Sequence, residues 1–103
     1  MHPLIEQHRD EIAGLCRRFA VRRLEVFGSA ARGADFDVAT SDADFLVSFD
    51  ANADRSPLAL YAGLTEALQR LLGRTVDLVN PEAVTNPYVL ASINRSRQVI
   101  YGA

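Results

Sequence analysis

The chain has 103 residues, 49% of them hydrophobic and 23% charged, and its 11 basic and 13 acidic residues give a formal net charge of −2. This size and composition predict a single globular domain over residues 1–103, with no room for a second substrate lobe. All the basic residues are arginine. The negative net charge argues against direct nucleic-acid binding, which usually needs a basic surface.

The N-terminal segment carries charges at Glu6, Arg9 and Asp10, so it does not resemble a signal peptide. No apolar run reaches the roughly 20 residues of a transmembrane helix. The single cysteine, Cys16, has no partner for an internal disulfide. A cytoplasmic location without membrane contact is therefore expected.

Hydrophobic spacing predicts helices that alternate with short strands. Ser56 and Pro57 are typical of a helix start and Gly73 of a helix end, whereas Asn86 and Pro87 start a later helix. In chain order we predict a helix over 3–19, a strand over 22–27, a short helix or turn over 30–33, a polar loop over 35–41, a strand over 44–49, a helix over 57–72, a strand over 74–79, a helix from 86 and a strand over 98–101. This order predicts an α/β (α+β) fold, a small mixed β-sheet with helices packed on it.

A glycine and a serine, Gly28 and Ser29, follow the first predicted strand. Glycine allows close approach of the backbone, and a turn of this kind can hold a phosphate through backbone N–H groups and the hydroxyl. An ordinary strand-ending turn is the alternative interpretation.

Two aspartates, Asp42 and Asp44, open the second predicted strand. Side chains at i and i+2 share one face, about 7 Å apart along the chain. At about 6 Å and an effective dielectric of 20, their repulsion of roughly 3 kcal/mol favours a bound divalent cation. Oxygen ligands favour Mg²⁺ or Mn²⁺. A solvated strand entrance with aspartates as turn residues is the alternative.

A third aspartate, Asp77, interrupts the apolar run of a later strand, where aspartate is uncommon. It either faces water on an edge strand or, if its strand neighbours that of Asp44, joins the same face. In the second case three carboxylates converge near the Gly28–Ser29 turn, an arrangement that suits two-metal phosphoryl transfer.

Taken together, Gly28-Ser29, Asp42-Ala43-Asp44 and Asp77 resemble the signature of DNA polymerase beta-type nucleotidyltransferases. The stretches 27–33 and 41–45 are similar to the minimal nucleotidyltransferase (MNT) antitoxins of HEPN/MNT toxin–antitoxin systems. The resemblance implies a nucleotidyltransferase fold and transfer of AMP from ATP to a tyrosine of a HEPN-type toxin, a ribonuclease from the neighbouring gene.

The resemblance also implies residue roles. Gly28, Ser29 and Arg32 would contact the nucleotide phosphates, with helix capping or a salt bridge as alternatives for Arg32. Asp42 and Asp44 would bind the metals, and Asp77 would share the catalytic metal and activate the acceptor hydroxyl. The sequence departs from the family at Ala30, where many members carry a basic residue.

Other functions remain open at this stage. The chain could neutralise its toxin by contact alone, or act as a nucleotidyltransferase on RNA or a small molecule, or be a structural domain without chemistry. Outside the motifs, Arg97 is interpreted as complementing a helix dipole, and Tyr61, Tyr88 and Tyr101 as packing residues.

Overall fold

A computed structural model describes residues 1–32 and 42–102. Its elements are, in chain order, α1 (Pro3–Gln7), α2 (Arg9–Arg18), β1 (Val21–Phe27), α3 (Ser29–Arg32), β2 (Ala43–Phe49), α4 (Pro57–Leu72), β3 (Val76–Val79), the 3-10 helix η1 (Pro81–Ala83), α5 (Pro87–Ser96) and β4 (Gln98–Tyr101). The predicted order of helices and strands is confirmed. The polar loop predicted over 35–41 lies outside the described residues.

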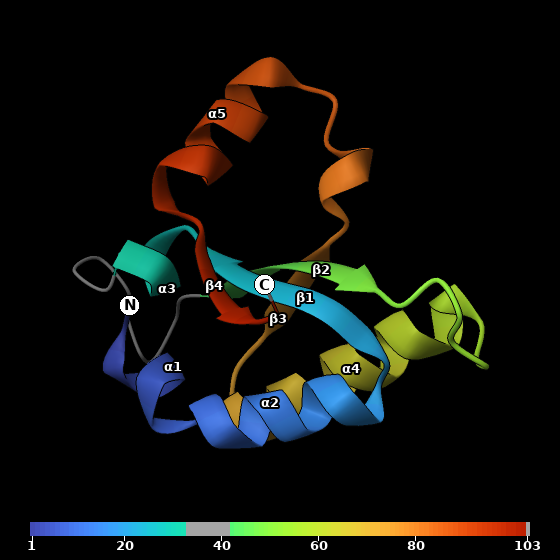
Figure 1. The fold of residues 1–103 in the computed structure, drawn as a ribbon. Helices are drawn as coiled ribbons and strands as arrows, with labels where there is room; N and C mark the ends of the chain where they lie inside the picture. The colour runs from blue at the N-terminus through green and yellow to red at the C-terminus, as the bar shows by residue number, and fades with distance from the viewer. Residues whose placement is uncertain (33–41, 103) are drawn as a thin grey trace.

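The four strands form one mixed sheet in the order β3-β2-β1-β4. Strand β1 is antiparallel to both β2 and β4, whereas β2 and β3 run parallel. Figure 1 shows α1, α2 and α4 on one face of this sheet and α5 with η1 on the other. The predicted α/β class with a small mixed sheet is therefore confirmed.

The hydrophobic core lies between the sheet and the helices α1, α2 and α4. Helix α4 begins where the Ser56 hydroxyl accepts the Ala59 N–H at 3.2 Å, and it ends at Gly73, whose φ is +66°. Between these caps a leucine returns every four residues, so one stripe of the helix is buried against the sheet. The stripe consists of Leu60, Leu64, Leu68 and Leu72.

The first predicted helix is wrong in one respect, because it is two helices and not one. The break falls at His8, whose φ of −107° and ψ of 14° depart from helical values. The His8 ring nitrogen Nδ1 lies 2.8 Å from the Leu4 carbonyl oxygen. The side chain thus forms a hydrogen bond with a backbone carbonyl group of α1. Hydrophobic spacing alone does not reveal such a side chain–backbone contact.

The two faces of the sheet differ in character. In β2, Phe45 and Val47 are buried in the core, whereas Asp44 and Ser48 alternate with them and face the α5 side. The candidate site is therefore built on the face opposite to the core. Within the two described stretches, no helix is long and apolar enough to cross a membrane.

Candidate active site

Parallel pairing of β2 with β3 sets Asp44 directly opposite Asp77. Cross-strand partners have their Cβ atoms only about 5 Å apart and point to the same face. Asp42 lies two residues before Asp44, immediately ahead of β2, and is exposed. The three aspartates selected from the sequence thus gather at one end of the sheet.

The Asp44 carboxyl is partly buried, and its titration is strongly shifted. Its pKa is raised from the ordinary 3.8 to about 6, first by burial and then by the negative charges of Asp77 and Asp42. Both causes penalise the ionised form. The fold therefore holds a carboxylate in a place where a positive charge would stabilise it.

This donor set fits a hard divalent cation. Carboxylate oxygens are the ligands of Mg²⁺ and Mn²⁺, and a cation would offset the mutual repulsion of Asp44 and Asp77. Across residues 1–32 and 42–102, no three His, Cys, Asp or Glu side chains already stand close enough to hold a metal by themselves. Mg²⁺ commonly takes only one or two carboxylates and completes its shell with substrate phosphates and water.

The turn after β1 lies against the same carboxylate. Gly28 has a φ of +70°, and a Cβ atom built on it would stand 3.1 Å from Asp44 Oδ2. Glycine is thus required at this position for its backbone angle and for its lack of a side chain. The first helical residue after the turn is Ser29, which begins α3.

A pocket of about 420 Å³ opens between this turn and α5. Its volume lies within the usual range for small-molecule sites. From the sheet side it is lined by Phe27, Gly28, Ser29 and Asp44, and from α5 by Val89, Ser92, Ile93 and Ser96.

Of the six predicted site residues, the pocket brings together Gly28, Ser29 and Asp44. Asp42 and Asp77 lie beside Asp44 and are not part of its lining. The backbone of Arg32 ends α3, and its side chain lies outside the described part of the structure.

Sequence reasoning missed the contribution of α5. Ser96 lines the pocket, and its hydroxyl oxygen accepts the Gly28 N–H at 2.9 Å. Next to it, Arg97 donates from Nε to the buried Glu25 at 2.6 Å. Arg97 was expected only to complement a helix dipole. These contacts span 68 and 72 residues, so no local pattern signals them.

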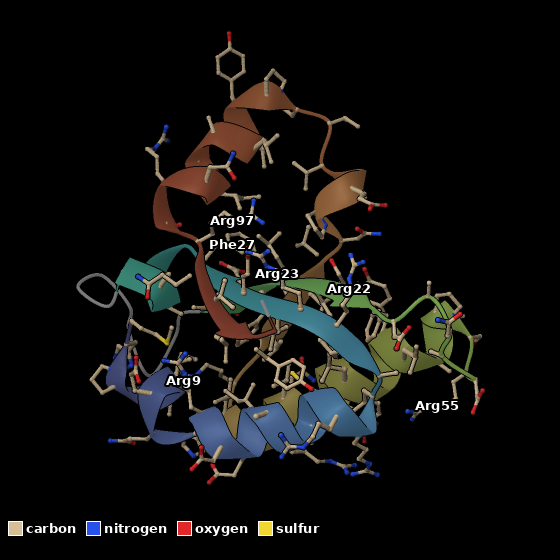
Figure 2. The ribbon with its side chains drawn as sticks, in the orientation of Figure 1. Arg9, Arg22, Arg23, Phe27, Arg55 and Arg97 are labelled. Atoms are coloured by element: carbon tan, nitrogen blue, oxygen red, sulfur yellow. The ribbon has the colours of Figure 1, made fainter. Side chains whose placement is uncertain are left out.

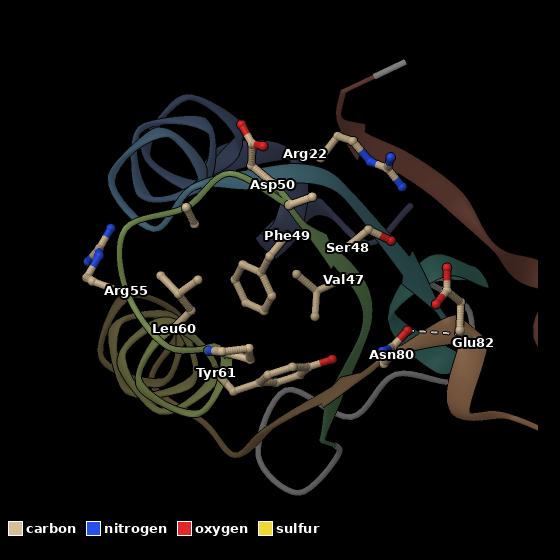
Figure 3. A pocket seen from close by; sticks show the side chains of 13 residues that line it. Arg22, Val47, Ser48, Phe49, Asp50, Arg55, Leu60, Tyr61, Asn80 and Glu82 are labelled. Carbon is tan, nitrogen blue, oxygen red and sulfur yellow. Dashed lines mark hydrogen bonds between the residues drawn. The ribbon is translucent and has the colours of Figure 1, made fainter.

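A second pocket, of about 310 Å³, lies at the other end of β2, where Phe49 and Tyr61 meet edge to face with ring centroids 5.0 Å apart. Figure 3 shows the Tyr61 hydroxyl directed toward Asn80, and Arg22 at the rim. Because β2 carries Asp44 near its start and Phe49 at its end, this pocket is separate from the carboxylate site.

The family model described as "Nucleotidyltransferase domain" matches residues 9–100. The chain therefore belongs to the nucleotidyltransferase domain family, and its fold is that of a nucleotidyltransferase. Within this family it is similar to the minimal nucleotidyltransferases. One solved structure, provisionally described as a minimal nucleotidyltransferase, shares 33% identity and a TM-score of 0.73, with 95% of each chain covered.

Two curated relatives are named protein adenylyltransferases. Protein adenylyltransferase MntA of Thermococcus cleftensis is 33% identical over 98 residues, which cover 95% of this chain and 88% of the relative. A Methanocaldococcus jannaschii protein, provisionally named a protein adenylyltransferase, is 40% identical over 76 residues, 74% of this chain and 73% of the relative. An antitoxin–toxin complex solved with AMP-PNP shares the fold, with a TM-score of 0.67 and 22% identity over 92% of this chain and 73% of that one.

Proposed function

We propose that this nucleotidyltransferase transfers AMP from ATP to a hydroxyl, with tyrosine as the expected acceptor, of a HEPN-type toxin and so acts as its antitoxin. The observation that carries the proposal is the register of Asp44 opposite Asp77 beside the Gly28–Ser29 turn. The names of the relatives support the protein acceptor. A structural neighbour pairs a tri-AMPylated HEPN toxin of Shewanella oneidensis with an MNT antitoxin.

Each predicted site residue has a role in this reaction. Gly28, Ser29 and Arg32 contact the nucleotide phosphates, and Asp42 and Asp44 bind the metal ions. Asp77 would share the catalytic metal with them when it is bound, and it accepts the proton of the acceptor hydroxyl.

The reaction is a displacement at phosphorus. The acceptor oxygen forms a bond to the α-phosphorus, the bond from that phosphorus to the bridging oxygen of the β-phosphate breaks, and pyrophosphate leaves. The hydroxyl proton passes to the Asp77 carboxylate. Mg²⁺ or Mn²⁺, when bound, would favour ionisation of the hydroxyl and neutralise charge on the triphosphate.

The surroundings of the pocket favour a protein acceptor. At the start of α5, Tyr88 is 86% exposed and Val89 is 48% exposed, and Val89 lines the pocket. Exposed aromatic and aliphatic groups beside an open pocket suit contact with another protein. An RNA acceptor is disfavoured by the net charge of −2.

The test uses ATP labelled at its α-phosphate, Mg²⁺, the purified chain and the product of the neighbouring gene. Label is expected on the partner with the unchanged chain. Asp44→Asn and Asp77→Asn should each reduce labelling by about a hundredfold or more, because loss even of groups that only support metal ligands costs about 10–100-fold.

Asp54→Asn is the matched control, since Asp54 is exposed in the turn after β2, away from the site, and should leave labelling unchanged. Full labelling by Asp44→Asn would contradict the proposal. A stable complex that transfers no label, and that neutralises the partner only at equal amounts, would instead establish an antitoxin that works by contact.

A further inference from the structure

Helix α5 is anchored to the rest of the molecule mainly at its C-terminal end. Of its ten residues only Ile93 and Ser96 are buried. Figure 1 shows its other end standing away from the sheet. Since the pocket lies between α5 and the Gly28 turn, whatever anchors α5 also shapes the pocket.

The first anchor acts directly on the turn. The Gly28 N–H donates to Ser96 Oγ at 2.9 Å, and Ser96 is only 9% exposed. The Ser96 hydroxyl in turn donates a hydrogen bond to the Ile93 carbonyl oxygen at 3.5 Å. A Cβ atom at Gly28 would stand 3.1 Å from Asp44 Oδ2, so the Gly28 backbone lies next to a carboxylate of β2 and is bonded to a hydroxyl of α5.

The second anchor fixes the residue that follows Ser96. Arg97 donates from Nε to Glu25 Oε2 at 2.6 Å, and Glu25, only 2% exposed, also pairs with Arg23 at 2.5 Å. Arg97 further donates to the Asn94 side chain at 2.8 Å. Figure 2 shows Arg23 and Arg97 between α5 and the sheet. Charge-assisted bonds of this kind are short and directional, so the backbone at Ser96 has little freedom to move away from Gly28.

We propose that Ser96 is a positioning residue for nucleotidyl transfer, an inference that rests on the proposed function. Its hydroxyl holds the Gly28 peptide, and through that peptide it sets where the Ser29 hydroxyl stands relative to Asp44. Without Ser96 Oγ the Gly28 N–H loses its partner, and the turn can move by fractions of an ångström. Misplacement of about 1 Å can cost a reaction about a hundredfold in rate.

The test compares three substitutions on α5. Ser96→Ala removes the acceptor for the Gly28 N–H, and Ser96→Thr keeps a hydroxyl. Ala91→Ser is the control, since Ala91 is exposed on α5 and does not line the pocket. The measurements are kcat and KM for ATP in the labelling reaction, and hydrogen exchange of the Gly28 amide followed by NMR.

Ser96→Ala should lower kcat by about tenfold or more with a smaller change in KM, because the lost contact orients the turn and does not itself touch the nucleotide. Exchange of the Gly28 amide should accelerate in the same variant. Ser96→Thr should restore both values to within about threefold, and Ala91→Ser should change neither. If Ser96→Ala does not fold, Ser96→Cys replaces it, since a thiol is only a weak acceptor.

Unchanged kcat in Ser96→Ala, or unchanged exchange of the Gly28 amide, would overturn the proposal. The amide exchange and the affinity for Mg²⁺–ATP are measured without the partner. If the unchanged chain labels nothing, the proposed function fails. Ser96 then keeps its assigned role toward the turn if its alanine variant still accelerates exchange of the Gly28 amide with little change in Mg²⁺–ATP affinity, and loses that role if exchange is unchanged.

Discussion

Gly28 and Gly73 have nearly the same φ angle, +70° and +66°, and different surroundings. A Cβ at Gly28 would crowd Asp44 Oδ2, whereas a Cβ at Gly73 would meet nothing within 4 Å. Alanine in this left-handed region costs roughly 1–2 kcal/mol. We therefore expect Gly28→Ala and Gly73→Ala to lower the free energy of unfolding by similar amounts, measured by urea denaturation.

Only Gly28→Ala should also reduce nucleotidyl transfer, by about tenfold or more, because it alone displaces the Asp44 carboxylate. Gly73→Ala is thus the control for backbone strain. Equal transfer activity in the two variants would show that the Gly28 turn does not require its close approach to Asp44.

The Asp44 carboxyl should make the stability of the metal-free protein depend on pH. Its pKa of about 6 in the folded state lies above the ordinary 3.8, so the folded protein binds this proton more tightly than the unfolded chain. The resulting stabilisation is fully present below about pH 4 and is lost as the pH rises through about 6. Metal-free protein should accordingly have a higher urea midpoint at about pH 5 than at about pH 7.5.

Asp44→Asn provides the control for this prediction, since an amide does not titrate in this range. Its urea midpoint should fall less than that of the unchanged chain between the same two pH values, and should be the higher of the two at about pH 7.5. Parallel profiles for the two proteins would mean that Asp44 is not the group responsible.

At the scale of elements, the contact of α2 with α4 depends on Gly63. A Cβ at this position would stand 2.5 Å from Phe19 Cε1. The Phe19 ring is 8% exposed and lies beneath the guanidinium groups of Arg18 and Arg55, at 5.2 and 5.4 Å from the ring centroid. The ring has little room to withdraw, so an added methyl group should overpack this contact.

Gly63→Ala should therefore destabilise the protein by about 1–3 kcal/mol, although alanine is intrinsically the better helix former by about 1 kcal/mol. Gly14→Ala is the matched control in α2, where the nearest atom to the new Cβ is the flexible end of Arg17 at 3.9 Å. It should be neutral or stabilising by up to about 1 kcal/mol in thermal unfolding. A stabilising Gly63→Ala would contradict the packing described for Phe19.

Elements that depend on local signals were predicted well from the sequence. The caps Ser56 and Gly73 bound α4 as expected, and the strand over 98–101 has the predicted limits. For Asp77 the sequence left two alternatives open, and each holds in part. Asp77 is exposed on the edge strand β3, and it also lies opposite Asp44.

What the sequence did not reveal depends on contacts across the chain. Glu25 alternates with Leu24 and Val26, a pattern typical of a strand position that faces solvent, yet it is only 2% exposed and pairs with Arg23 and Arg97. Tyr88 was interpreted as a packing residue, and this is wrong, since it is 86% exposed. Such differences depend on how far α5 covers the second face of the sheet, which no local periodicity encodes.

At the scale of the whole molecule, the hydrophobic core lies on one face of the sheet and the candidate active site on the other. The core residues Phe45 and Val47 face α2 and α4, whereas Asp44 on the same strand faces the α5 side. Removal of a metal ion or nucleotide should therefore leave the core and the cooperative unfolding transition intact, in contrast to small domains that fold only around a metal.

Bound ligand should nevertheless add stability, because only the folded chain brings Asp44 opposite Asp77. At about 100 times its dissociation constant, Mg²⁺–ATP should contribute about 2.7 kcal/mol, equivalent to about 10 °C or more in Tm for a domain of roughly 100 residues. Differential scanning fluorimetry with and without EDTA measures this shift. Asp44→Asn should lose most of it and Asp54→Asn should retain it. Complete unfolding in EDTA alone would show instead that the fold depends on the ion, and that the two faces of the sheet are not independent.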